Sequence, residues 1–147
     1  MRVQNGGRDM LVNVQITKHI SLAEVVCHCR QCNEQNYNLA FLRRIDKFIR
    51  DEFEDAPIII DRVCSCAAHN AFIGGAEHSR HLSYTPKDNS AQEQAKALQA
   101  FAIDIGAIQG YTIEQARVIC NLKWFGGVEQ NISWLHLDGG PNQRFSK

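Results

Sequence analysis

The sequence has 147 residues, the length of one ordinary domain at roughly 100–200 residues per domain. Hydrophobic residues make up 44% and charged residues 22%, which is typical of globular proteins and excludes a disordered or collagen-like chain. Sixteen basic residues balance sixteen acidic ones, so the formal net charge is zero. Proteins that bind a phosphate backbone usually carry a basic excess. Because this chain carries none, nucleic acid is not expected as a partner.

No part of the sequence is apolar over enough residues to span a membrane. The uninterrupted apolar runs, such as residues 57–60, are short, whereas a membrane helix needs about 20 apolar residues. The first twenty residues lack the apolar stretch and the small-residue cleavage pattern of a secretory signal peptide. We therefore expect no membrane insertion, and synthesis in the cytoplasm without a signal peptide.

Behind a loose start at residues 1–11, the sequence predicts four helices. Three begin with a capping box, in which a hydroxyl side chain and a Glu or Gln three residues later satisfy backbone amides reciprocally. The remaining helix is predicted by apolar residues at steps of three and four. In chain order the helices are 22–27 (Ser21 with Glu24), 38–54 (apolar periodicity), 91–99 (Ser90 with Glu93) and 113–123 (Thr112 with Gln115).

Three short apolar stretches bounded by turn residues predict strands, at residues 57–61, 101–105 and 132–138. Helices and strands mix without the regular alternation of a βαβ protein. We therefore expect an α+β fold, in a single domain over residues 1–147.

Cysteine is a frequent residue for a chain of this length. The sequence contains six cysteines, in a C-x-C-x-x-C cluster, a C-x-C pair and one separate position: Cys27, Cys29, Cys32, Cys64, Cys66 and Cys120. Three states are compatible with this pattern: buried free thiols, disulfides formed outside the cytoplasm, or a structural zinc site. The C-x-C spacing differs from the C-x-x-C of common zinc knuckles, so free thiols are preferred and the other two states stay open.

Two histidines and one aspartate lie in contexts that favour chemistry. His81 follows a Gly-Gly turn, Asp104 lies between isoleucines in a predicted strand, and His136 lies between leucines in another. An aspartate in an apolar strand is costly unless it is paired or bound to a metal. Two imidazoles and one carboxylate, with a fourth position left to water, form a common ligand set of catalytic zinc. The H-E-x-x-H spacing of zincins is absent.

Three separated motifs in the same order resemble the zinc D-alanyl-D-alanine carboxypeptidase family of bacterial and phage cell-wall peptidases. They are HNAFIGGAEHSRHL (69–82), AFAIDI (100–105) and WLHLDGG (134–140). The resemblance covers about residues 16–140. It implies a hedgehog-type fold with a small antiparallel sheet and helices packed around it. It also implies Zn²⁺ on His81, Asp104 and His136, and hydrolysis of peptide bonds next to D-amino acids in peptidoglycan stem peptides.

The sequence departs from the family pattern in the spacing of the aspartate. The family usually places it seven residues after the first histidine, where this chain has Asp88 in a polar turn. We favour Asp104, because a metal ligand needs a rigid, partly buried element to hold it. That choice makes about residues 83–99 an insertion near the site.

Two further family positions carry other residues here. The family's general base, three residues before the last histidine, is replaced by Ser133, so we expect Asp138 to serve instead, with Glu129 and Glu77 as weaker candidates. On a strand, residues two apart share a face, so His136 and Asp138 project together. The family's substrate-binding or oxyanion-binding arginine aligns with Ser65, and Arg62 is the expected substitute.

The leading hypothesis is a zinc peptidase, either a carboxypeptidase or an endopeptidase, that acts on the cell wall once it is released. A phage origin would suit the missing signal peptide. The alternative is a catalytically weak or inactive zinc-binding module of the same fold, acting as a wall-binding or virion structural part. A third hypothesis is an interaction domain stabilised by zinc on five of the cysteines: Cys27, Cys29, Cys32, Cys64 and Cys66.

Overall fold

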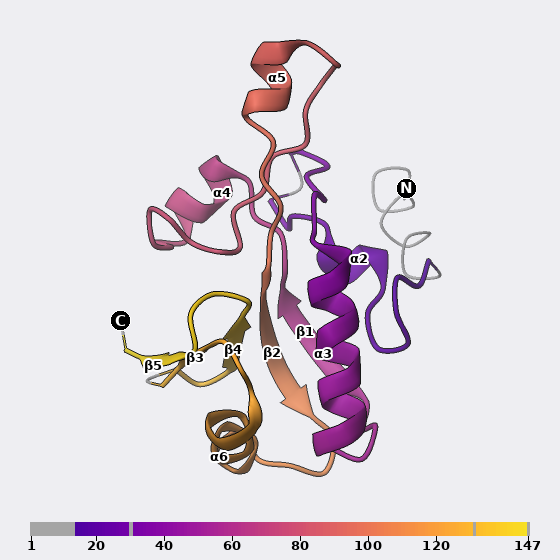
Figure 1. Ribbon diagram of the computed structural model, residues 1–147, viewed down its shortest axis with the longest axis vertical. Coiled ribbons are helices and arrows are strands. Elements are labelled where there is room, and N and C mark those ends of the chain that lie inside the picture. The colour runs from indigo at the N-terminus through magenta and orange to yellow at the C-terminus, as the bar shows by residue number, and fades with distance from the viewer. Residues whose placement is uncertain (1–13, 30, 131, 147) are drawn as a thin grey trace.

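A five-stranded sheet forms the centre of the part of the chain that the computed structural model describes, residues 14–29, 31–130 and 132–146. The strand order is β1-β2-β4-β3-β5 (Figure 1), and every neighbouring pair is antiparallel except β3 and β5. The strands are β1 (Ile58–Arg62), β2 (Ala102–Ile108), β3 (Gly127–Glu129), β4 (Leu135–Asp138) and β5 (Gln143–Phe145). This mixed architecture confirms the expected α+β class with a small, mostly antiparallel sheet. The loose start predicted for residues 1–11 lies outside the described residues.

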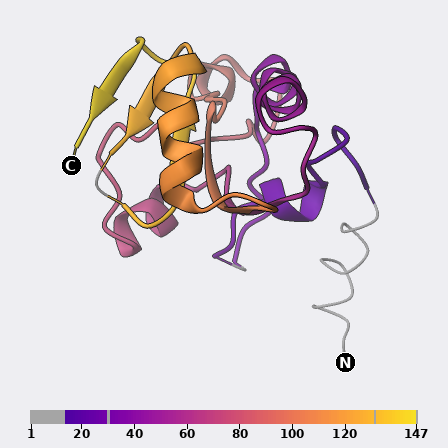
Figure 2. The same ribbon diagram turned by 90° about the horizontal axis from the view of Figure 1, so that it is seen from below.

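The longest helices, α3 and α6, cross at a steep angle beside the sheet. Helix α3 is seen from the side in Figure 1 and end-on in Figure 2, and α6 is seen the other way round. The described helices are α2 (Leu22–Val25), α3 (Leu39–Glu52), α4 (Ala67–Phe72), α5 (Ala91–Ala95) and α6 (Ile113–Lys123). None of them is long and apolar enough to cross a membrane.

The two faces of the sheet differ in chemistry. Along β2, Ile103 and Ile105 join the apolar core, and along β4 Leu135 and Leu137 do the same. That core includes the buried side chains of α3: Phe41, Leu42, Ile45, Phe48 and Ile49. Because alternate strand residues point to opposite faces, the residues between them project to the other face. Asp104 therefore lies there between the isoleucines of β2.

An irregularity in β1 directs an arginine to this second face. Ile60 pairs with Ile105, whereas Arg62 pairs with Asp104, so two residues of β1 advance against one of β2. A bulge of this kind re-aims the side chain that follows it. Without it, Arg62 would share the face of Ile60 in the core. Gly106 leaves room for the bulged Asp61, since a Cβ at Gly106 would lie 2.6 Å from a carboxylate oxygen of Asp61.

Residues 83–99, predicted as an insertion, project from one end of the molecule and carry α5 (Figure 1). Tyr84 and Leu98 pair across the base of this segment. The carboxylate of Glu34 fastens the base further, accepting hydrogen bonds from the Ser83 hydroxyl at 3.0 Å and the Thr85 amide at 2.8 Å. The segment is thus anchored at its base and exposed beyond it. That it is an insertion relative to the family stays a prediction.

The helix predicted at 113–123 matches α6, and the one predicted at 38–54 matches α3 within two residues at each end. The helices predicted at 22–27 and 91–99 are shorter, at Leu22–Val25 and Ala91–Ala95. Helix α4 and the three-residue strands β3 and β5 were not predicted. Each is too short to show an apolar period, and α4 buries only Asn70 among its six residues.

The cap of α6 gives a first prediction. The Thr112 side chain accepts a hydrogen bond from the Gln115 amide at 3.0 Å, and the Gln115 side-chain oxygen accepts one from the Thr112 amide at 2.9 Å. Thr112→Ala is expected to lower the free energy of unfolding by about 1 kcal/mol, measured by urea denaturation. Ser90→Ala removes the corresponding cap of α5, which buries none of its residues, so it should leave the midpoint nearly unchanged. Equal effects of the two substitutions would contradict this assignment.

Candidate metal centre

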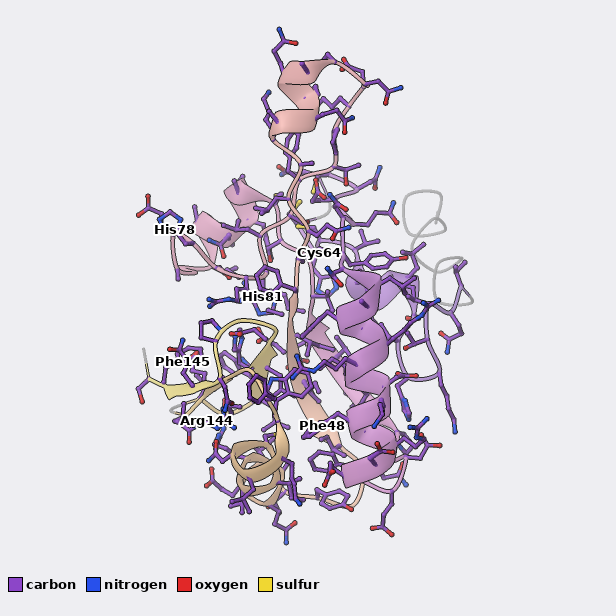
Figure 3. The ribbon with its side chains drawn as sticks, in the orientation of Figure 1. Phe48, Cys64, His78, His81, Arg144 and Phe145 are labelled. Atoms are coloured by element: carbon purple, nitrogen blue, oxygen red, sulfur yellow. The ribbon has the colours of Figure 1, made fainter. Side chains whose placement is uncertain are left out.

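Three side chains that are far apart in sequence meet on the polar face of the sheet. His81 comes from the loop after α4, Asp104 from the middle of β2 and His136 from β4. One ligand atom from each lies within 4.8 Å of the others. Asp104 Oδ1 lies 3.0 Å from His81 Nε2 and 2.9 Å from His136 Nδ1. In Figure 3 the labelled His81 lies on the α4 and β5 side of the molecule, whereas Phe48 of the core lies beside α3.

Local structure fixes the segment that presents His81. The amide of Asn70, buried in α4, donates to the Ala76 carbonyl at 2.9 Å and closes the following turn. Gly75 lies so close to this amide that a Cβ there would meet the Asn70 side chain at 2.1 Å. The Ser79 hydroxyl accepts from the His81 amide at 3.2 Å, and the Ser65 amide donates to the His81 carbonyl at 2.9 Å. These contacts hold the backbone of His81 on both sides.

The His81 ring is fully buried, and its surroundings select one tautomer. Its Nδ1 lies 2.9 Å from the Val63 carbonyl oxygen, which can only accept, so Nδ1 carries the proton. Burial lowers the pKa of His81 and favours the neutral ring, although Asp104 opposes this shift. The Nε2 lone pair then faces the Asp104 carboxylate. Two acceptors in contact at this distance repel unless a cation lies between them.

His136 has carboxylates at both ring nitrogens. Its Nε2 lies 3.0 Å from Asp138 Oδ2, opposite the contact of Nδ1 with Asp104. Burial alone would lower the pKa of His136, but the two carboxylates outweigh it and raise the pKa to about 9. When both ring nitrogens are protonated, His136 donates to both carboxylates. The contact between His81 and Asp104 still has no donor in that state.

A divalent cation satisfies all three groups at once. With protons on His81 Nδ1 and His136 Nε2, two imidazole lone pairs and one carboxylate oxygen converge on a common point. Burial would raise the pKa of Asp104, but the two histidines lower it well below its usual range, so the carboxylate is ionised. Imidazole and carboxylate are good zinc donors, and three protein ligands leave a position for water. The donor set therefore fits a catalytic zinc ion.

Asp138, expected from sequence as a base, is engaged on both oxygens. Oδ2 contacts His136 Nε2, and Oδ1 accepts from the amides of Gly127 at 3.2 Å and Gly140 at 2.9 Å. The side chain is 1% exposed. These contacts match the carboxylate that commonly orients a metal-bound histidine and fixes its tautomer. They favour a positioning role for Asp138, and a role as base stays a prediction.

This arrangement gives a second prediction. Asp138→Asn keeps the shape of the side chain but replaces one of its two acceptor oxygens with an NH₂ group. Because the side chain can no longer accept at both positions, His136 loses its fixed orientation. We expect zinc affinity at the centre to fall about 10–100-fold, measured by competition with a chromophoric chelator. Asp88→Asn is the control, because Asp88 is exposed. Equal affinities in the two variants would contradict the orienting role.

Arg62 lies against the centre, as the sequence suggested for a functional arginine. Its Nε donates to Asp104 Oδ2 at 3.2 Å, which leaves Oδ1 free to face the histidines. The Arg62 Nη1 atom is buried without a hydrogen-bond partner. Arg62 therefore orients Asp104 and keeps an unused donor. Its predicted contact with a substrate carboxylate or oxyanion is untested.

The structure makes Asp88 a weaker candidate for a metal ligand, and Glu129 a stronger candidate for the general base. Asp88 is exposed, and its carboxylate accepts from the Ser90 amide at 2.8 Å beside α5, outside the cluster. Glu129 in β3 is 5% exposed, and its Oε2 is buried without a partner. A Cβ at Gly127 would lie 2.4 Å from the Asp138 carboxylate. Glu129, two residues further along β3, shares that face.

Register places Glu129 next to the metal centre. Gly127 of β3 pairs with Asp138 of β4 in an antiparallel ladder. Two residues further along β3 is Glu129, and the matching move along β4 leads from Asp138 to His136. The register therefore places Glu129 opposite His136, on the same face of the sheet. On its other side Glu129 pairs with Phe145, whose ring contacts His136 edge-on at 5.7 Å. The sequence gives little signal for this role of Glu129, because the strand that presents it has only three residues and shows no alternation.

Comparison with known proteins gives one match. Residues 18–138 match the family model described as Peptidase M15. No curated protein and no solved structure matches. The matched range contains both histidines and the aspartate of the centre, as well as Arg62, Glu129 and Asp138. The chain therefore belongs to the peptidase M15 family of metallopeptidases, the D-Ala-D-Ala carboxypeptidase type, with the hedgehog-type fold that this family implies.

Proposed function

We propose that this protein is a zinc-dependent hydrolase of bacterial cell-wall peptidoglycan, cleaving peptide bonds next to D-amino acids in the stem peptides. The proposal covers DD-carboxypeptidase and endopeptidase activity. Its main support is the convergence of His81 Nε2, Asp104 Oδ1 and His136 Nδ1, three acceptors with no donor between them in the neutral tautomers. Membership of the peptidase M15 family supports the choice of a peptide substrate.

In this proposal His81, Asp104 and His136 hold the zinc ion. When bound, zinc lowers the pKa of a water molecule toward about 7 and polarises the carbonyl group under attack. Asp138 holds His136 in the tautomer that leaves Nδ1 free. Arg62 holds Asp104 through Oδ2 and offers Nη1 to negative charge that develops on the substrate.

We assign proton transfer to Glu129 in preference to Asp138. Both oxygens of Asp138 already accept hydrogen bonds, whereas Glu129 Oε2 accepts none. A buried acceptor without a partner is costly, and its retention beside a hydrolytic centre supports a working role. Glu129 would take a proton from the attacking water and deliver it to the leaving amine, which is general acid–base catalysis.

We also propose a location and an origin that suit this substrate. The protein would act on the cell wall after release from the cytoplasm, and a phage or prophage lytic enzyme is one such source. Its partners would be peptidoglycan stem peptides, with no nucleic acid and no membrane insertion. Incubation of intact cells with external protein, compared with purified walls, tests whether access to the wall limits activity.

The experiment that tests the function uses purified zinc-loaded protein on two substrates. One is a stem pentapeptide ending in D-Ala-D-Ala, for which free D-alanine is measured. The other is crosslinked peptidoglycan, for which new amino groups are measured. We expect product from at least one substrate, loss of activity with a chelator and recovery when zinc is restored.

Failure on both substrates, with zinc still bound at the centre, would overturn the proposed function. It would favour the alternative of a catalytically inactive module of the same fold. A pull-down with insoluble peptidoglycan then distinguishes a wall-binding module from a protein that does not bind the wall. Activity that persists in chelator after the zinc has been removed would contradict the role of the metal.

A further inference from the structure

A second group of metal-binding side chains lies outside the centre described above. The Sγ atoms of Cys27, Cys29, Cys32 and Cys66 all lie within 4.8 Å of one another. Cys29 and Cys32 are 3.3 Å apart at sulfur, and Cys29 and Cys66 are 3.9 Å apart. In Figure 3 yellow sulfur atoms gather just above the label of Cys64, at the level of α4. Three of these residues come from the segment after α2, and the fourth, Cys66, is the N-cap residue of α4.

The sulfur spacing fits a tetrahedral metal better than a disulfide. Sulfurs at 2.3 Å from zinc at the corners of a tetrahedron lie about 3.8 Å apart. The Cys29–Cys32 spacing of 3.3 Å and the Cys29–Cys66 spacing of 3.9 Å lie on either side of that value. A disulfide needs about 2.05 Å between sulfurs. The structure describes all six cysteines, and none of them forms a disulfide. A single disulfide would bring two sulfur atoms together, whereas four lie close to one another here.

Backbone amides point at three of the four sulfurs. The Cys66 amide donates to Cys27 Sγ, the Gln31 amide to Cys29 Sγ and the His69 amide to Cys66 Sγ, each at 3.4 Å. Amide donors stabilise the negative charge that thiolates carry when they bind a metal, and such outer contacts fix ligand orientation. The cluster therefore offers four soft ligands, and backbone amides donate to three of them.

We propose that Cys27, Cys29, Cys32 and Cys66 bind a structural zinc ion as a tetrathiolate site, separate from the hydrolytic centre. Four cysteines close the coordination sphere and leave no position for water, which is the arrangement of structural zinc. The site does not depend on the proposed peptidase activity. It replaces the sequence-based preference for free thiols at these four positions, whereas Cys64 and Cys120 stay buried thiols outside the cluster.

The site would join two parts of the chain that support the hydrolytic centre. Cys66 lies next to Ser65, whose amide and carbonyl bond the backbones of His81 and Ser83. The amide of Cys27 donates to the Glu34 carbonyl at 2.9 Å, and Glu34 fastens the base of the projecting segment. A metal at the cysteines therefore links the segment after α2 to the loop that carries His81.

The test counts zinc per chain in full-length protein purified under reducing conditions. We expect two zinc ions in the unaltered protein, one in His81→Ala/His136→Ala and one in Cys29→Ser/Cys32→Ser. Cys64→Ala is the matched control, because Cys64 belongs to the same C-x-C pair as Cys66 but lies outside the cluster. It should retain two.

X-ray absorption at the zinc edge on the His81→Ala/His136→Ala variant identifies the ligands without altering any cysteine. Four sulfur ligands at about 2.3 Å support the proposal. Zinc with only nitrogen and oxygen ligands, no zinc, or a Cys29–Cys32 disulfide in its place would overturn it. This variant also decides the matter if the cysteine variant fails to fold. Absence of hydrolysis in the unaltered protein, with the sulfur-bound zinc intact, would count against the proposed function alone.

Discussion

Asp104→Asn is expected to abolish zinc binding at the hydrolytic centre and to lower the rate of hydrolysis about 10³-fold or more. Asp104 Oδ1 contacts both histidines, at 3.0 Å from His81 Nε2 and 2.9 Å from His136 Nδ1. The amide of asparagine is uncharged and is a poor ligand for zinc, so the centre loses its anionic donor. Zinc contributes several kcal/mol of transition-state stabilisation, and each 1.36 kcal/mol corresponds to about tenfold in rate.

The measurement for this variant combines metal content with the release of D-alanine or new amino groups. Asp88→Asn is the matched control, because Asp88 has the family's usual spacing from the first histidine but is exposed beside α5. It should keep both zinc and activity. If Asp88→Asn loses activity and Asp104→Asn retains it, the ligand assignment is wrong.

Glu129→Gln is the second substitution with a large expected effect, and it should lower activity without removing zinc. The substitution preserves shape but removes the carboxylate that accepts a proton. General acid–base catalysis contributes about 10²–10⁴-fold, so we expect kcat to fall by that factor while zinc stays bound. The separation of activity from zinc content distinguishes a proton-transfer residue from a ligand.

Glu77→Gln is the control for this prediction, because Glu77 was also a candidate base and is exposed in the loop before His81. Its activity should be unchanged. A Glu129→Gln variant with full activity would return the role of base to Asp138. Loss of zinc in that variant would instead assign Glu129 to the support of the metal ligands.

The sequence was informative where residues act through local patterns. The capping box at Thr112 located α6, and the apolar period from Phe41 to Phe53 located α3, because both signals extend over a full turn or more. The apolar residues around Asp104 and His136 placed each of them in a strand. The resemblance to a peptidase family, now supported by the match over residues 18–138, united them with His81.

The remaining features depend on register and on tertiary contacts that no local pattern encodes. The bulge at Asp61 turns Arg62 toward Asp104, and it arises from the pairing of β1 with β2. Glu129 is placed by a three-residue strand whose partner begins six residues later. The sulfur cluster brings Cys66 to Cys29, which is 37 residues earlier. The sequence favoured free thiols because the C-x-C spacing differs from the C-x-x-C of common zinc knuckles. No local pattern showed that Cys66 joins the three cysteines of another segment.

Anomalous scattering at the zinc absorption edge, from crystals of the full-length protein, tests the central claim most directly. We predict a peak at about 2.0–2.2 Å from His81 Nε2, an Asp104 carboxylate oxygen and His136 Nδ1, the usual bond lengths for these ligands. Zinc-loaded crystals without a peak among these three side chains, or with a peak only at the cysteines, would contradict it.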